Sequence, residues 1–262
     1  MGKNKPNPKA VAARKAEQTR KKRSRLIMIL IVVVAALAVV GITIGMILST
    51  KSSNPMTNGE YDELISADRG FTITSSGPAT TPDAKPSESK HTVELYFDYS
   101  CSHCAQFEGE YGEQLLQGAR DGKYKLQLHP VDTQGRFFPY AYTAVDLAAR
   151  VYSSQPEKFT ELHTALSDAM LNAVNSQNQD DIAEIQSETK SLELTKKIAK
   201  DHGVSQDIID RVSHKDGMML LTTMSQEWGS EIKAESLATP MVVIDGKVIE
   251  TTDQAMKDIA KL

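Results

Sequence analysis

The stretch "YFDYSCSHCAQFE" (Tyr96–Glu108) holds both cysteines of the 262-residue chain, Cys101 and Cys104. A disulfide across so short a loop would contribute only roughly 2 kcal/mol by loop-closure entropy, so the pair would be a weak structural staple. A zinc site usually needs four ligands, and no second Cys/His pair at metal spacing accompanies these two. The spacing therefore favours a redox pair that cycles between dithiol and disulfide, and we expect no metal and no other cofactor.

The residues around the cysteines predict a strand, a helix and a second strand. "HTVELYFDYS" (His91–Ser100) is rich in β-branched and aromatic residues, which is typical of a buried strand. "AQFEGEYGEQLLQGAR" (Ala105–Arg120) has its apolar residues at helical spacing, and "KYKLQLHPVD" (Lys123–Asp132) alternates like a strand. This order predicts a βαβ unit with parallel strands and a right-handed crossover.

The remainder of the chain predicts a long helical segment and then a hairpin. Residues 137–235 have helical patterns throughout, and Trp228 and the run Met218–Leu221 are expected in the core of this segment. "MVVIDGKVIE" (Met241–Glu250) carries Asp245-Gly246, a strong signal for a two-residue hairpin turn. A helix over 252–262 follows, and "GFTITSS" (70–76) predicts a short strand upstream.

The N-terminus predicts a membrane anchor. Ten Lys or Arg and one Glu occupy residues 1–25, and the apolar run Leu26–Leu48 follows, with 23 residues and no charge. As a helix this run would span roughly 34 Å, enough to cross a bilayer. A signal-peptide core is shorter, about 7–15 residues, so an uncleaved signal anchor is favoured over a cleaved signal.

Charge indicates the orientation of this anchor. The basic residues abut the apolar run on its N-terminal side, and the positive side stays in the cytoplasm. Residues 26–262 hold 20 basic and 33 acidic side chains, so the rest of the chain has the opposite charge balance. We expect the basic tail to set the orientation of the anchor in the membrane and to contact anionic lipid. We expect no nucleic-acid partner, since no nucleic-acid-binding fold accompanies these residues.

The predicted organisation has four parts. They are a cytoplasmic tail (1–25), a transmembrane signal anchor (26–48), a linker (49–67) and an extracytoplasmic domain (68–262). The linker assignment follows from a stretch rich in Ser, Thr, Pro, Asn and Gly that begins at residue 49.

The order of elements and three motifs resemble the DsbA-like thiol–disulfide oxidoreductases of the thioredoxin superfamily. The motifs are the C-x-H-C stretch that opens a helix, "LATPMVVIDGKVI" with Thr239-Pro240, and the helical segment with "KFTELHTAL". The resemblance covers about residues 68–262. It implies a thioredoxin-like α/β fold with a helical insertion at about 137–235, and a cis peptide bond at Thr239-Pro240 beside the cysteines.

The resemblance also implies roles for individual residues. Cys101, facing solvent at the positive end of a helix, would be the reactive thiolate, and Cys104 would be the more buried resolving thiol. Ser102 and His103 lie between them, and a protonated His103 would add positive charge. Thr239 and Pro240 would border the groove for the substrate peptide.

Two positions depart from the pattern of the family. Ser102 stands where proline is usual, so the redox potential cannot be carried over. Leu95 stands where the superfamily commonly has a buried acid that serves Cys104. Glu94 is adjacent but should face the other side of the strand. Asp98 is a candidate substitute, although a polar residue that merely ends the strand is the favoured interpretation.

The favoured function is an extracytoplasmic oxidoreductase that donates disulfides to secreted or surface proteins. Its partners would be reduced or unfolded exported proteins, a membrane protein that reoxidises the pair, and the membrane itself through Leu26–Leu48. A reductase or isomerase remains an alternative, as does a membrane-tethered chaperone on a thioredoxin fold. The intact cysteines and Thr239-Pro240 favour the enzyme over the chaperone.

Overall fold

The computed structural model describes residues 70–80, 88–134, 137–176, 178–232 and 237–262. The tail, the apolar run Leu26–Leu48 and the linker 49–67 lie outside the described residues. Within the described part of the chain, no helix has the length and apolar character needed to span a bilayer.

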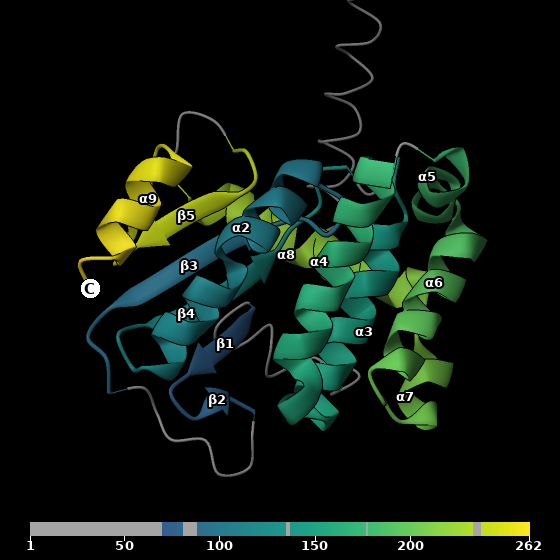
Figure 1. Cartoon of the computed structure of the whole chain (residues 1–262), viewed down its shortest axis with the longest axis horizontal. Coiled ribbons are helices and arrows are strands. Elements are labelled where there is room, and N and C mark those ends of the chain that lie inside the picture. Colours follow the sequence, from purple (N-terminus) through teal and green to yellow (C-terminus); the bar gives the residue numbers. More distant parts are fainter. Residues whose placement is uncertain (1–69, 81–87, 135–136, 177, 233–236) are drawn as a thin grey trace, which may run out of the picture. The chain divides into compact units, whose positions relative to one another are not determined.

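A six-stranded mixed sheet forms the centre of the domain, in the order β2-β1-β4-β3-β5-β6 (Figure 1). β3 and β4 are parallel, as the βαβ prediction requires, whereas β5 runs antiparallel to β3 and β1 antiparallel to β4. The strands are β1 (Phe71–Thr74), β2 (Gly77–Pro78), β3 (Thr92–Phe97), β4 (Lys125–Pro130), β5 (Met241–Ile244) and β6 (Lys247–Ile249).

The pairing register divides β3 between the two faces of the sheet. Leu95 lies opposite Leu128 of β4 and Val242 of β5, and all three belong to the main apolar core. The next residue, Tyr96, lies opposite Met241, and both belong to a second, smaller cluster. Because side chains alternate along a strand, the two clusters occupy opposite faces of the sheet.

Two helices cover the face that carries the main core. α2 (Ser102–Arg120) connects β3 to β4, and α9 (Thr252–Ile259) follows the hairpin. Both contribute buried side chains to the same cluster as Val93 and Leu95. The opposite face packs against α8 (His214–Glu231), whose Trp228 ring lies 6.0 Å from the ring of Tyr96, centroid to centroid.

The helical insertion lies between β4 and β5 in the sequence and packs beside the sheet (Figure 1). α3 is buried along most of its length because α4, α6 and α8 pack around it. α4 also packs against α2, so the insertion contacts the helix that bears the cysteines. Besides α8, the insertion comprises α3 (Tyr140–Ser154), the 3-10 turn η2 (Pro156–Lys158), α4 (Phe159–Ser176), α5 (Gln179–Gln186), α6 (Glu188–Asp201) and α7 (Gln206–Arg211).

The predicted hairpin is confirmed. Asp245 and Gly246 have φ values of 50° and 78°, the left-handed backbone that a two-residue turn of this kind requires. The Asp245 carboxylate accepts hydrogen bonds from the Thr92 N–H and lies 2.8 Å from His91 Nδ1. The turn is therefore tied to the start of β3.

Three details differ from the sequence-based expectations. Side-chain periodicity alone placed the start of the cysteine helix at Ala105, whereas α2 begins at Ser102 with Cys101 as its N-cap residue, as the resemblance implied. Met218 is 41% exposed, so the run Met218–Leu221 is only partly in the core. Trp228 is buried as predicted, but it packs on the sheet as well as on the insertion.

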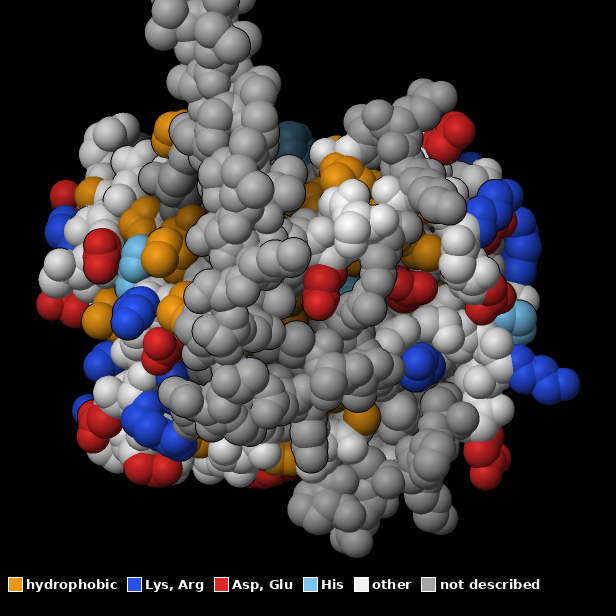
Figure 2. Space-filling view, turned by 180° about the vertical axis from the view of Figure 1, so that it is seen from behind, with side chains coloured by type: hydrophobic (Ala, Val, Ile, Leu, Met, Phe, Trp, Pro, Cys, Tyr) orange, Lys and Arg blue, Asp and Glu red, His pale blue; other side chains and the backbone are white. Residues whose placement is uncertain are grey.

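The face opposite to that of Figure 1 carries charges of both signs. Figure 2 shows Lys and Arg side chains interspersed with Asp and Glu over the coloured surface. Hydrophobic side chains gather there in smaller groups between them.

Candidate active site

Cys101 and Cys104 lie at the N-terminus of α2, directly after β3. Cys101 is the N-cap residue, with φ −90° and ψ 117°, and its carbonyl accepts the N–H of Ala105 at 3.0 Å. Both thiols are free. The expectation that Cys101 is open to solvent is wrong for this form, since the residue is 3% exposed and Cys104 is 6% exposed.

The two thiols have opposite electrostatic environments. The hydrogen bond from Cys104 lowers the pKa of Cys101 from 9.0 to about 6, against the effect of burial, and the Cys104 backbone N–H and Thr239 add to the lowering. Burial, together with the same hydrogen bond to Cys101, raises the pKa of Cys104 well above 9.0. At neutral pH this pair holds one thiolate and one thiol, with the negative charge on Cys101.

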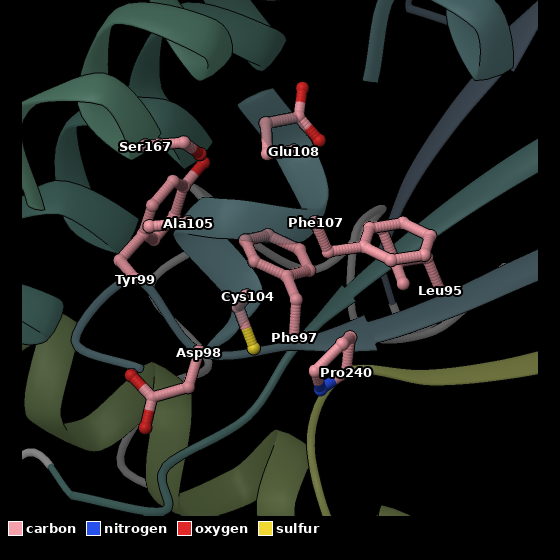
Figure 3. Close-up of a pocket in the computed structure, with 10 residues that line it drawn as sticks. All are labelled: Leu95, Phe97, Asp98, Tyr99, Cys104, Ala105, Phe107, Glu108, Ser167 and Pro240. Carbon is pink, nitrogen blue, oxygen red and sulfur yellow. The ribbon is translucent and has the colours of Figure 1, made fainter. Parts of the chain in front are cut away.

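Thr239-Pro240 lies beside the pair, although 138 residues separate it from Cys101. The Thr239-Pro240 peptide bond is cis, as predicted. The Cys101 thiol donates to the Thr239 carbonyl at 3.7 Å. Pro240 and Cys104 line one small pocket, which has room for about one water molecule (Figure 3). The structure thus brings the two distant motifs together.

Ser102 and His103 form the exposed side of the first turn of α2. His103 is exposed and Ser102 is partly exposed. Neither side chain enters the pocket behind the cysteines. Both side chains therefore border solvent at this end of α2.

Asp98 was expected to be a simple polar strand end, and the structure gives it a more specific place. It directly follows β3, is 1% exposed and lines the pocket with Cys104 (Figure 3). Oδ1 accepts the N–H and the hydroxyl of Ser100, each at 2.7 Å. Oδ2 accepts the N–H of Thr133 at 2.8 Å, its hydroxyl at 2.6 Å, and the N–H of Gln134 at 3.1 Å. The carboxylate therefore connects the cysteine loop to the loop after β4.

Leu95 is buried and lines the same pocket, so an apolar side chain occupies the position where an acid is usual. Glu94 faces the other side of the sheet, as predicted. Its carboxylate accepts the Tyr96 hydroxyl at 3.2 Å and lies 3.6 Å from His129 Nε2. Burial raises the pKa of Glu94, but the sheet separates it from the cysteines.

The sequence did not reveal Glu108 as part of this region. Glu108 is 8% exposed and lines the pocket, and its Oε2 lies 3.6 Å from Nε2 of His163. His163 is buried, and its Nδ1 lies 2.8 Å from the Tyr99 hydroxyl. A Cβ on Gly112 would clash with Glu108 Oε1, so the carboxylate extends along α2 toward Gly112. Glu108 and His163 thus join α2 to α4 beside the pocket that Cys104 lines.

The fold and the site together define a class: a dithiol at the N-terminus of a helix, beside a cis-proline loop, in a thioredoxin-like fold with a helical insertion. Residues 86–261 match the family model described as Thioredoxin. The chain belongs to this thioredoxin family.

Solved structures of thiol–disulfide oxidoreductases share the fold. MdbA from Actinomyces oris is 23% identical, with a TM-score of 0.52, over 65% of this chain and 80% of that chain. MdbA from Corynebacterium diphtheriae is 17% identical, with a TM-score of 0.51, over 77% and 98% of the two chains. DsbA from Chlamydia trachomatis is 20% identical, with a TM-score of 0.52, and the match covers 72% of this chain and 89% of that chain. The search of curated proteins found no match.

These similarities confirm the predicted fold. The expected DsbA-like architecture, a thioredoxin-like sheet with a helical insertion, is shared with proteins that carry the names MdbA and DsbA.

Proposed function

We propose that this protein is an extracytoplasmic thiol–disulfide oxidoreductase that donates disulfides to exported proteins through Cys101 and Cys104. One observation carries the proposal. Within a single helical turn, the pKa of one thiol is lowered to about 6 and that of the other is raised, beside Thr239-Pro240. A structural disulfide needs no such asymmetry, whereas thiol–disulfide exchange depends on a stabilised thiolate as attacking or leaving group.

The exchange begins with the pair in its disulfide form. A substrate thiolate attacks the Cys101 sulfur, the Cys101–Cys104 bond breaks, and Cys104 leaves and takes up a proton. A second substrate thiol loses its proton and attacks the substrate sulfur of the mixed disulfide. Cys101 then leaves as a thiolate, the substrate has lost two electrons, and the pair has gained them. The low pKa of Cys101 makes it a good leaving group in this last step.

Cys104 is the resolving thiol in this proposal. Its attack on the Cys101 sulfur of a mixed disulfide reforms the Cys101–Cys104 bond and releases the substrate. Burial holds Cys104 protonated, so Cys101 remains the sulfur that meets the substrate.

Thr239, Pro240, Ser102 and His103 form the proposed rim of the substrate site. The Thr239 carbonyl lies within reach of the Cys101 thiol, so an extended peptide that pairs with the backbone here would place its sulfur beside Cys101. His103, exposed in the first turn, adds positive charge near the thiolate when it is protonated.

The topology belongs to the same proposal. The apolar run Leu26–Leu48 anchors the chain, residues 1–25 stay in the cytoplasm, and the catalytic domain from about residue 68 lies outside. Disulfides persist in such an oxidising compartment. The substrates are reduced exported proteins, and a membrane protein returns the pair to the disulfide form.

Two assays on the purified chain separate donation from reduction. The oxidised protein is mixed with reduced, unfolded ribonuclease, and recovery of ribonuclease activity is followed. The reduced protein is mixed with insulin, and precipitation of the reduced chains is followed. We expect strong activity in the first assay, lost in Cys101→Ser. Activity in the second assay alone would identify a reductase, and none in either would contradict an enzyme.

A further inference from the structure

The Asp98 side chain has the hydrogen-bonding pattern of a carboxylate. Its two oxygens accept five hydrogen bonds, and three of the five donors are backbone N–H groups that cannot reverse their role. Charge-assisted hydrogen bonds of this kind hold a negative charge in place even where water is excluded. The residue is 1% exposed, so the charge is only weakly screened by solvent.

This negative charge is carried by the residue three positions before Cys101, whose sulfur becomes negative in the reduced pair. The Asp98 carbonyl accepts the Cys101 N–H at 3.0 Å, and Oδ1 of its carboxylate accepts the N–H of Ser100, the residue directly before Cys101, at 2.7 Å. Asp98 also lines the pocket with Cys104. Like charges in a poorly solvated site disfavour each other. The carboxylate does raise the pKa of Cys101, against the stronger lowering effect of Cys104.

We propose that Asp98 is a positioning residue that sets the redox equilibrium of the cysteine pair: its buried carboxylate opposes the Cys101 thiolate and so favours the disulfide. The proposal rests on the proposed function, because it concerns the direction in which the same pair transfers electrons. The proposal also gives the buried Asp98 carboxylate a role at a site where Leu95, an apolar residue, occupies the position of the usual acid.

The equilibrium can be written against glutathione. One glutathione disulfide accepts two electrons from the dithiol, two glutathione thiols form, and the Cys101–Cys104 bond closes as both thiols lose their protons. A group that destabilises the Cys101 thiolate raises the free energy of the dithiol form alone. Its removal therefore shifts the pair toward the dithiol and makes the disulfide a stronger oxidant.

Few other titratable groups act on Cys101 within the described chain. Cys104 lowers the pKa of Cys101 and Asp98 raises it, while the uncharged side chain of Thr239 lowers it through a hydrogen bond. His103 lies on the exposed side of the same turn. The effect of Asp98 can therefore be separated by removing its charge alone.

The experiment compares the full chain with Asp98→Asn and Asp98→Ser, two neutral variants of different shape. The equilibrium constant with glutathione is measured at pH 7.5 and at pH 4.5. At pH 7.5 we expect both variants to favour the dithiol about three- to tenfold more than the parent, which corresponds to a Cys101 pKa lowered by about half to one unit. At pH 4.5 Cys101 is protonated in every variant, so the difference should shrink to nearly nothing.

The matched control is Thr133→Val, which removes one hydrogen bond to Oδ2 and keeps the charge. If Asp98 acts by its charge, this variant should not lower the Cys101 pKa, because the carboxylate is then less neutralised. A lowered pKa in Thr133→Val would overturn the proposal, even if both Asp98 variants failed to fold. The proposal would also be overturned if the equilibrium with glutathione were unchanged in Asp98→Asn and Asp98→Ser, or if it shifted equally at pH 7.5 and pH 4.5.

Failure of the proposed function has a different signature. In that case the parent pair would not exchange with glutathione at any pH. The Cys101 pKa, measured from the pH dependence of its alkylation, would still be lower in Asp98→Asn if the charge argument holds. An equal pKa in parent and variant would overturn the argument itself.

Discussion

Replacing Cys104 with alanine removes the group that contributes most to the low pKa of Cys101. The Cys104 thiol donates a hydrogen bond to the Cys101 sulfur, and this is the largest of the effects that lower the pKa to about 6. A hydrogen bond to a charged group contributes about 1.5–3 kcal/mol. At about 1.36 kcal/mol per pKa unit, its loss should raise the Cys101 pKa by about one to two units, to roughly 7–8.

The control is Cys104→Ser, whose hydroxyl can still donate to the sulfur. Its Cys101 pKa should lie between those of the parent and Cys104→Ala. The pKa is read from thiolate absorbance at 240 nm, or from the rate of alkylation by iodoacetamide, between pH 4 and 10. If Cys104→Ala kept a pKa near 6, the reasoning would be refuted, because the helix N-terminus alone would then stabilise the thiolate.

Four further results are expected. In the reduced parent, iodoacetamide at pH 6 should label Cys101 and spare Cys104, and equal labelling would contradict the assigned roles. Because the folded-state pKa of Cys101 lies below its unfolded value, the stability that this thiolate contributes is fully present above the unfolded pKa, near 9, and is lost as the pH falls through about 6. In urea unfolding, the free energy of unfolding of the reduced parent should therefore rise relative to that of Cys101→Ala between pH 6 and 8.5. A difference between the two proteins that stays constant with pH would argue against this. Phe71→Ala should lower the free energy of unfolding by about 3–5 kcal/mol, since Phe71 is fully buried against Tyr152 and Phe159. A loss under 1 kcal/mol would show that the surrounding side chains close the cavity left by the ring. Protease added to intact cells should digest the chain after residue 49 and spare residues 1–25, whereas a shortened, released form would indicate a cleaved signal.

The parts of the fold that follow from local sequence were predictable. The strand, helix and strand around the cysteines are encoded by side-chain periodicity, and the hairpin by Asp245-Gly246, whose left-handed backbone the structure confirms. The cis bond at Thr239-Pro240 was predicted from the resemblance, because the motif beside it is specific. Even the opposed faces of Glu94 and Leu95 follow from the two-residue period of a strand.

Other features depend on contacts between distant segments. The donors that hold the Asp98 carboxylate come from Ser100 nearby and from Thr133 and Gln134, 35 and 36 residues away. No local pattern marks these residues as partners of an acid. The Glu108–His163 contact between α2 and α4 is likewise invisible before the insertion docks on the cysteine helix.

Burial of Cys101 was mispredicted for a related reason. Its place at a helix N-terminus suggested an open thiol, but accessibility depends on the loops that surround the helix end. The Thr239 carbonyl approaches from 138 residues away. Trp228 shows the same limit, since its helical pattern predicted burial but did not specify the sheet face on which it packs.

The equilibrium between the Cys101–Cys104 pair and glutathione tests the central claim most directly. The chain is incubated in mixtures of reduced and oxidised glutathione at pH 7, and the fraction of protein disulfide is measured after acid quenching. With the Cys101 pKa near 6, we expect a reversible pair that is more oxidising than thioredoxin, whose potential is about −270 mV. A pair that stays fully oxidised at the highest glutathione thiol concentrations, as a structural disulfide does, would contradict the account.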